Sequence, residues 1–369
     1  VAPDEGAPMK VPPDEGAPAK VAPDEGAPMK VPPDEGAPIK VLLDVDTGVD
    51  DAVAIALALN SPELNVIAIT TVAGNAPVEL CTRNTLLLTE LLKSDVPVAR
   101  GAERPLVKRL LTAPEVHGPD GLGGPLGTLP EPLGRPVDEP AHELLTRIGM
   151  ENPGEVVLVA TGPLTNLARA LADDGESLSR YRRIVAMAGA FDVPGNTGPV
   201  AEFNVYVDPD AAQRVMSSRA DVTMVPLDAT TGAELPGREL RAHPHAATPV
   251  LLRPGRNIAR VLNRALDYYI SFQRAESGLD AGYMHDPLAV ASLLEPAVFR
   301  AERDRIRIVT EGPDRGRTLK EGRNDGDVGC EASVAVDADG KILLALLNER
   351  VLSPILGEPG PLTGPGSHT

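Results

Sequence analysis

Residues 41–51 read Val-Leu-Leu-Asp-Val-Asp-Thr-Gly-Val-Asp-Asp and place four carboxylates directly behind an apolar run. Val41 to Leu43 are typical of the end of a buried strand, and residues 52–59 are typical of a helix. Gly48 permits a sharp turn between the two elements. The stretch therefore predicts a strand-to-helix turn at the edge of an α/β sheet, where such proteins bind their ligands.

The four carboxylates of this turn, Asp44, Asp46, Asp50 and Asp51, indicate a metal or catalytic site. Acids placed so close together repel one another unless a cation neutralises them. Carboxylate oxygens are hard ligands that suit Ca²⁺ or Mg²⁺. Capping of the helix N-terminus also fits Asp50 or Asp51. Capping does not explain Asp44 and Asp46, which alternate at the strand end.

Strand-like and helix-like segments alternate through the rest of the chain. Apolar, β-branched runs predict strands at 39–46, 65–72, 96–100, 156–161, 183–190 and 222–227. Helices are predicted at 50–59, 78–93, 164–171, 209–217, 257–275 and 287–294. The fold class is therefore α/β, with a doubly wound, mostly parallel sheet flanked by helices.

Three further segments complete the predicted organisation. Residues 101–140 are rich in Gly and Pro and predict a long loop or lid. Residues 333–336 and 341–347 flank Asp-Ala-Asp-Gly, which predicts a hairpin. Residues 1–38 form acidic, Pro-rich decapeptide repeats and are expected to be disordered. A single catalytic domain is then expected at 39–356, followed by a loose tail at 357–369.

Composition narrows the possible functions. The formal net charge of −18 argues against a nucleic-acid-binding surface. No run approaches the ~20 apolar residues of a membrane helix. The two cysteines, Cys81 and Cys330, provide no disulfide framework, so a reducing compartment is the simplest inference. We therefore expect a cytoplasmic protein that contacts neither nucleic acid nor membrane.

Other polar side chains follow the predicted strands, where a site should form. They are Asn75, Thr161, Asn196, Glu202, Asn204 and the pair His285–Asp286, with His117 in the Gly-rich segment. Each also has an ordinary structural explanation. Asn75 and Asn196 fit turn positions, and Glu202 fits a solvated charge. Asp286 before Pro287 fits a helix N-cap. Their joint occurrence is what favours a functional site.

With these segments in hand, the chain resembles the nucleoside hydrolase family, the inosine-uridine-preferring ribohydrolases. The resemblance covers residues 40–351. It rests on Asp-x-Asp-x-Gly-x-Asp-Asp at 44–51, Thr-x-x-Gly-Asn at 71–75 and Gly-Asn-x-x-x-x-Ala-Glu-Phe-Asn at 195–204. His-Asp-Pro at 285–287 and Asp-Arg-Gly-Arg-Thr at 314–318 extend it in the same order.

The resemblance implies Ca²⁺-dependent hydrolysis of ribonucleosides to ribose and free base, in a homodimer or homotetramer. It implies Ca²⁺ ligands from Asp46, Asp51, Asp286 and the Thr161 carbonyl. Asp46 would also be the general base acting on a metal-bound water, and His285 the acid near the leaving base. The implied substrate-binding residues are Asp50, Asn75, His117, Met187, Asn196, Glu202 and Asn204.

Two departures and two alternatives accompany this assignment. Thr47 stands where the family commonly has Pro, and Ala188 replaces a usual Gly. Tyr268, Tyr269 and Tyr283 are candidates to contact the base, and the sequence does not choose among them. Asp-x-Asp-Thr after a strand also fits a phosphohydrolase of the haloacid dehalogenase type. A non-catalytic, Ca²⁺-dependent sugar-binding protein would retain the same acids.

Overall fold

The computed structural model describes residues 36–243, 257–321 and 330–357. Its main feature is a nine-stranded sheet in the order β10-β9-β11-β6-β5-β4-β1-β2-β3. Pairs from β11 through β6, β5, β4, β1 and β2 to β3 are parallel, and only β9 with its two neighbours is antiparallel. The predicted doubly wound, mostly parallel sheet is therefore confirmed. The repeats of residues 1–35 lie outside the described residues, as does the tail after Gly357.

The nine strands of this sheet are β1 (Ile39–Val45), β2 (Leu64–Thr71), β3 (Val98–Arg100), β4 (Val157–Ala160), β5 (Arg183–Met187), β6 (Val222–Val225), β9 (Phe299–Ile308), β10 (Thr318–Lys320) and β11 (Cys330–Ala338). Those in the N-terminal two thirds of the chain begin and end close to the predicted positions. A separate two-stranded sheet pairs β7 (Glu234–Pro236) with β8 (Ala281–Tyr283).

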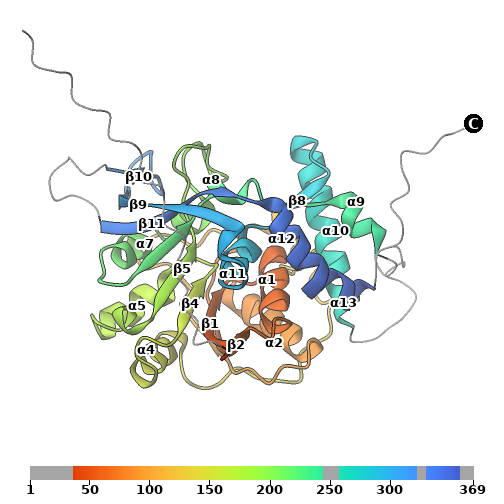
Figure 1. Ribbon diagram of the computed structural model, residues 1–369, viewed down its shortest axis with the longest axis horizontal. Helices are drawn as coiled ribbons and strands as arrows, with labels where there is room; N and C mark the ends of the chain where they lie inside the picture. The colour runs from red at the N-terminus through yellow and green to blue at the C-terminus, as the bar shows by residue number, and fades with distance from the viewer. Residues whose placement is uncertain (1–35, 244–256, 322–329, 358–369) are drawn as a thin grey trace, which may run out of the picture.

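Helices cover both faces of the sheet (Figure 1). On one face lie α4 (Ala141–Glu151), α5 (Thr165–Asp173) and α7 (Pro209–Met216), whose apolar side chains share one core. The other face carries α1 (Val49–Leu59), α2 (Val78–Leu91), α10 (Ile258–Ser277), α11 (His285–Leu294), α12 (Gly340–Leu347) and α13 (Ser353–Leu356). Shorter helices are α3 (Pro114–His117), α6 (Phe203–Val207), α8 (Leu227–Thr230) and α9 (Gly237–Ala242). One-turn helices lie at Leu178–Arg180 and Pro296–Val298, and a π-helical turn lies at Asn348–Leu352.

The hairpin predicted around residues 337–340 is wrong. Residues from Gly340 to Leu347 form helix α12 instead of a strand. Its N-terminus is capped by Asp339, whose side chain accepts from the backbone N–H of Lys341 at 2.9 Å. Strand β11 pairs instead with β9, a strand that the sequence did not reveal because six of its ten residues are charged. A short apolar run is compatible with both a helix and a strand. The Asp339 cap at the N-terminus of this run is the feature that favours a helix here.

Register brings the carboxyl ends of three central strands together. Asp44 at the end of β1 lies opposite Thr70 of β2 and Ala160 of β4. The first residues of α1 and α11 meet above these ends, and the two helices pack against each other. Side chains that follow β1, β2 and β4 are therefore placed around one point of the sheet edge.

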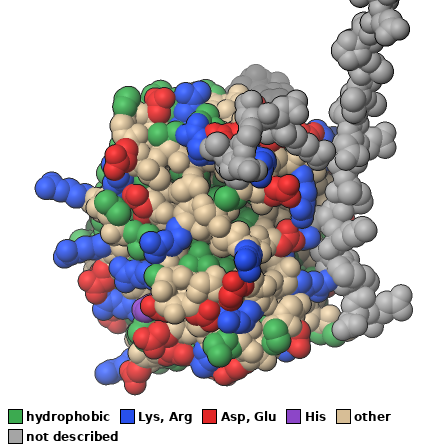
Figure 2. Space-filling view, turned by 90° about the vertical axis from the view of Figure 1, so that its left-hand side faces the viewer, with side chains coloured by type: hydrophobic (Ala, Val, Ile, Leu, Met, Phe, Trp, Pro, Cys, Tyr) green, Lys and Arg blue, Asp and Glu red, His purple; other side chains and the backbone are tan. Residues whose placement is uncertain are grey.

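The surface over α4, α5 and α7 intermixes acidic and basic side chains rather than gathering one sign (Figure 2). Among the described residues, no helix is long and apolar enough to cross a membrane.

Candidate active site

The first acid of the turn, Asp44, is held by side chains of the neighbouring elements. Its Oδ1 accepts from Thr70 Oγ1 at 2.5 Å and from Asn166 Nδ2 at 2.7 Å. Burial raises the pKa of Asp44 to about 7, although both donors favour the charged form. These contacts fix the end of β1 beneath the other acids, which is a bracing role.

Asn75 joins two of the other acids. Its backbone N–H donates to Asp46 Oδ2 at 2.7 Å, and its side-chain Nδ2 donates to Asp46 Oδ1 and Asp51 Oδ2 at 3.2 Å each. Asp51 also accepts from the Gly48 N–H at 2.8 Å and from Thr161 Oγ1 at 2.8 Å. The segment after β2 thus holds the acidic turn in place from one side.

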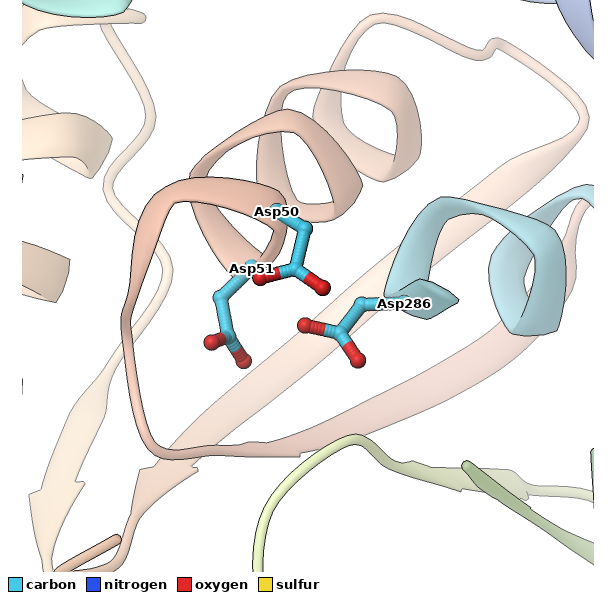
Figure 3. A group of neighbouring side chains, drawn as sticks. All are labelled: Asp50, Asp51 and Asp286. Atoms are coloured by element: carbon cyan, nitrogen blue, oxygen red, sulfur yellow. The ribbon is translucent and has the colours of Figure 1, made fainter. Parts of the chain in front are cut away.

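Asp50, Asp51 and Asp286 form the cluster that is best placed to hold a metal ion among the described residues. Each offers a carboxylate oxygen, and these oxygens lie within 4.8 Å of one another. Figure 3 shows the Asp50 and Asp286 carboxylates pointing toward each other from the starts of α1 and α11. Asp50 Oδ1 is buried and has no hydrogen-bond partner. An unpartnered buried carboxylate oxygen is costly unless a ligand satisfies it.

The raised pKa values of these carboxyl groups also favour a bound cation. Burial raises the pKa of Asp50 to about 7 and that of Asp46 and Asp286 well above the usual range. Repulsion from neighbouring carboxylates adds to the effect of burial at each of them. Burial likewise raises the pKa of Asp51. A bound cation would offset this repulsion.

Glu202 and Asn204 form a second polar wall at the start of α6. The Glu202 carboxylate accepts from three backbone N–H groups, those of Gly189, Asn204 and Val205, at 2.7–3.1 Å. Burial nevertheless raises the pKa of Glu202 to about 7. Asn204 Nδ2 donates to the carbonyls of Thr161 at 2.7 Å and Met187 at 3.1 Å. The predicted Thr161 ligand atom thus has an amide donor in this structure.

Asn196 differs from this group in being exposed. Its Oδ1 accepts from the Phe203 N–H at 2.8 Å, so it supports the turn before α6, and it also lines the cavity described below.

Two histidines flank the site. His117 Nδ1 accepts from the Val49 N–H at 3.1 Å, and its ring stacks on Tyr269 with centroids 6.0 Å apart. His285 Nδ1 lies 2.7 Å from Thr230 Oγ1, and its ring lies 5.5 Å from that of Tyr283. Burial lowers the pKa of His117 to about 3 and that of His285 to about 4, so both rings are neutral at physiological pH.

A cavity of about 500 Å³ brings these groups together. Its lining includes every predicted site residue except Asp46 and Asp51, which are buried behind it. Tyr269 and Tyr283 also line it, whereas the Tyr268 hydroxyl donates to backbone carbonyls of α3. Sequence reasoning missed the lining residues Leu227, Thr231, Phe272 and Gln273. Helical spacing from Tyr269 to Gln273 was the available signal for the last of these.

Comparison with known proteins identifies the chain's relatives. Residues 41–345 match the family model of the inosine-uridine preferring nucleoside hydrolases. The chain belongs to this family. It is therefore an N-glycosyl hydrolase that acts on ribonucleosides.

Individual relatives agree with the family assignment. The chain is 38% identical over 313 residues to a pyrimidine-specific ribonucleoside hydrolase RihA of Klebsiella pneumoniae, covering 84% of this chain and 97% of the relative. It is 40% identical over 314 residues to RihA of Salmonella arizonae, with the same coverage. A purine-preferring ribonucleoside hydrolase from Gardnerella vaginalis superposes with a TM-score of 0.78 and 32% identity, covering 86% of this chain and 99% of that one.

Proposed function

We propose that this nucleoside hydrolase cleaves ribonucleosides to ribose and free base in a Ca²⁺-dependent reaction with Asp46 as general base. The observation that carries the proposal is the unpartnered, buried Asp50 Oδ1 beside Asp51 and Asp286 in the cavity. The names of the relatives with 38–40% identity make uridine and cytidine the first substrates to test.

The donor set fits Ca²⁺. All groups available at this point are carboxylate, carbonyl or amide oxygens, and Ca²⁺ takes about 6–8 oxygen ligands in flexible geometry. Asp51 and Asp286 of the cluster, together with Asp46 and the Thr161 carbonyl, would hold the ion. Asp50, the third member of the cluster, would bind the sugar hydroxyls that complete its shell. When bound, the ion lowers the pKa of water and orients it toward the sugar.

The residues of the chain then perform separate tasks. Asp46, oriented by both donors of Asn75, accepts a proton from the attacking water. The water oxygen bonds to the anomeric carbon as the bond to the base nitrogen breaks. Asp50 and Glu202 stabilise the positive charge that develops on the sugar ring.

The remaining residues bind the sugar and assist the leaving base. Asn75, Asn196 and Asn204 bind sugar hydroxyls, and Met187 lies beneath the ring. With Thr230 donating to its Nδ1, His285 carries its proton on Nε2 and delivers it to the leaving base. His117 contacts the base beside it.

The charge of the lining favours a neutral substrate. Its charged side chains are Asp50, Glu115, Glu202, Glu276 and Asp286, and no Lys or Arg is found among the described residues that line the cavity. Apart from the proposed ion, a phosphate would meet only like charge there. This opposes the phosphohydrolase alternative and predicts that nucleosides, rather than nucleotides, are hydrolysed.

The test measures release of reducing sugar from a nucleoside panel with added Ca²⁺, in wild type and in Asp46→Asn. Loss of a general base predicts a fall in kcat of about 10²–10⁴-fold with an unchanged melting temperature. Asp95→Asn, an exposed change of the same kind, is the matched control. Wild-type kcat in Asp46→Asn would refute the base assignment. Binding of ribose without any hydrolysis would favour the non-catalytic sugar-binding alternative.

Assembly and location stay predictions. A homodimer or homotetramer is expected from the resemblance, and light scattering of the purified chain tests it. A cytoplasmic location is expected from composition, and fractionation of cells that express the full chain tests it.

A further inference from the structure

Part of the segment predicted to be a long loop or lid is tightly fixed. Residues 117–124 read His-Gly-Pro-Asp-Gly-Leu-Gly-Gly, and Asp120 at their centre is fully buried. Asp120 Oδ1 accepts from the N–H groups of Leu122 at 2.9 Å and Gly124 at 3.0 Å. Its backbone carbonyl accepts from Asn84 Nδ2 of α2 at 2.9 Å. The loop is therefore organised around this one carboxylate.

Arg264 of α10 fastens the loop from the other side. Its Nη2 donates to Asp120 Oδ2 at 2.7 Å, and its Nε and Nη2 donate to the Leu122 carbonyl at 3.1 and 2.9 Å. Nη1 donates to Thr128 Oγ1 at 2.8 Å. The Arg264 side chain is 15% exposed and that of Asp120 is 1% exposed, so water screens this ion pair little.

The backbone of the loop lies directly on α10. A Cβ at Gly123 would lie 2.8 Å from Tyr268 Cβ and 2.9 Å from Ala265 Cα, so no larger residue fits there. The Gly123 N–H donates to the His117 carbonyl at 2.8 Å, which links the fixed part of the loop to the histidine.

These contacts join the two walls of the cavity beside the histidines. The loop supplies Glu115, Val116 and His117 to the lining, and α10 supplies Tyr269 and Gln273. Besides this attachment, α3 has only four residues, no strand of the large sheet holds it, and the Tyr268 hydroxyl of α10 donates to its carbonyls. The connection through Asp120 and Arg264 therefore contributes to the orientation of His117 although it lies outside the cavity.

We propose that Asp120 and Arg264 are positioning residues that hold His117 against Tyr269 and the Val49 N–H, so that its Nε2–H stays directed at the leaving base and hydrogen-bonds it. The proposal rests on the proposed function in assigning His117 to the base. The role is indirect, since neither Asp120 nor Arg264 lines the cavity.

The main variant is Asp120→Asn. The amide oxygen still accepts from Leu122 and Gly124, but the new NH₂ group faces a guanidinium N–H, so the ion pair to α10 is lost while the hydrogen bonds within the loop remain. Arg264→Gln breaks the same link from the other side and serves if the first variant fails to fold. Arg147→Gln is the matched control, because Arg147 forms exposed ion pairs on α4, far from the lining.

The assay compares two substrates that differ in their need for His117. Uridine requires help at its leaving base, whereas 4-nitrophenyl riboside carries a leaving group that departs without a proton. Misplacement by ~1 Å predicts a fall of about 10²-fold in kcat/KM for uridine. The nitrophenyl riboside should lose less than about threefold, because its leaving group departs without a hydrogen bond from His117. In a His117→Ala background, Asp120→Asn should cause no further change in the ratio of the two rates.

A measurement independent of turnover completes the test. Nitrogen NMR of the histidine rings, assigned with His117→Gln, should show an unprotonated Nδ1 and a protonated Nε2 at His117 in wild type. Asp120→Asn should mix the two tautomers. Equal losses on both substrates, unchanged rates, or an unchanged tautomer would overturn the proposal. If the wild type cleaves neither substrate, the proposed function fails, and the tautomer still decides whether the two residues position His117.

Discussion

Gly74 gives a direct way to move the proposed general base without altering its chemistry. It lies in the segment after β2, and its φ is not in the left-handed region, so Ala at this position introduces no backbone strain. The added Cβ would lie 2.1 Å from Asp46 Oδ2 and 2.7 Å from Pro163 Cδ. Gly74→Ala therefore tests how closely Asp46 must be placed.

The size of the effect follows from these distances. Ordinary van der Waals contact requires the carboxylate oxygen to retreat by roughly 1 Å. A misplacement of ~1 Å costs about 10²-fold in rate. The hydrogen bond from the Asn75 N–H to the same oxygen, 2.7 Å long, would be lengthened as well. Crowding of this kind destabilises a folded core by about 1–3 kcal/mol.

We expect kcat for uridine to fall by about 10²-fold in Gly74→Ala while the protein stays folded. Steady-state kinetics with added Ca²⁺ measure the fall, and urea unfolding measures the accompanying loss of stability. Gly175→Ala is the control, because a Cβ there meets nothing within 4 Å and its φ is not positive. Wild-type kcat in Gly74→Ala would refute the argument that Asp46 must occupy this position.

Three further changes have defined outcomes. Chelation of Ca²⁺ should abolish turnover, and Ca²⁺ at a hundred times its Kd should raise the free energy of unfolding by about 2.7 kcal/mol, read by thermal shift against a Mg²⁺ control. Thr47→Val removes the 2.6 Å hydrogen bond between the Thr47 and Thr85 hydroxyls and should cost about 1 kcal/mol in urea unfolding. Its kcat should change little, since the acids keep their own partners; a large fall would assign Thr47 a part in catalysis. Deletion of residues 1–38 should leave kcat/KM unchanged because β1 begins at Ile39, and a large loss would show that the repeats contribute to activity.

The parallel part of the sheet was predictable because strands that are buried on both faces consist of continuous apolar runs. The segment from Val41 to Val45 is fully buried, as its composition indicates. The antiparallel edge was not predictable in this way. Strand β9 is rich in charged residues such as Arg303 and Arg305 and has few large apolar ones. Its strand conformation is set by its pairing with β11.

The candidate site was likewise predictable only in part. Acids and amides that follow strands could be predicted to meet, because parallel strands end at one edge of a sheet. The partners of each side chain could not. That Asn75 bridges Asp46 and Asp51, or that Asn204 donates to the Thr161 carbonyl, depends on rotamers set by packing. A Gly-rich loop likewise predicts flexibility until a distant cation such as Arg264 is known to hold it.

The four acids of the opening turn thus differ in what remains available on each of them. Asp44 receives two side-chain donors and braces the strand, while Asp46 and Asp51 share the donors of Asn75. Asp50 keeps a buried oxygen without a partner, opposite Asp286. Asp44 Oδ2 is likewise buried without a partner, but of these two acids only Asp50 lines the cavity, so its oxygen is the one that a bound ligand can satisfy. A sugar hydroxyl bound above the Asp50 and Asp286 carboxylates would give this oxygen a partner, and a cation beside it would offset their repulsion. The ion and the substrate would therefore stabilise the same group of acids.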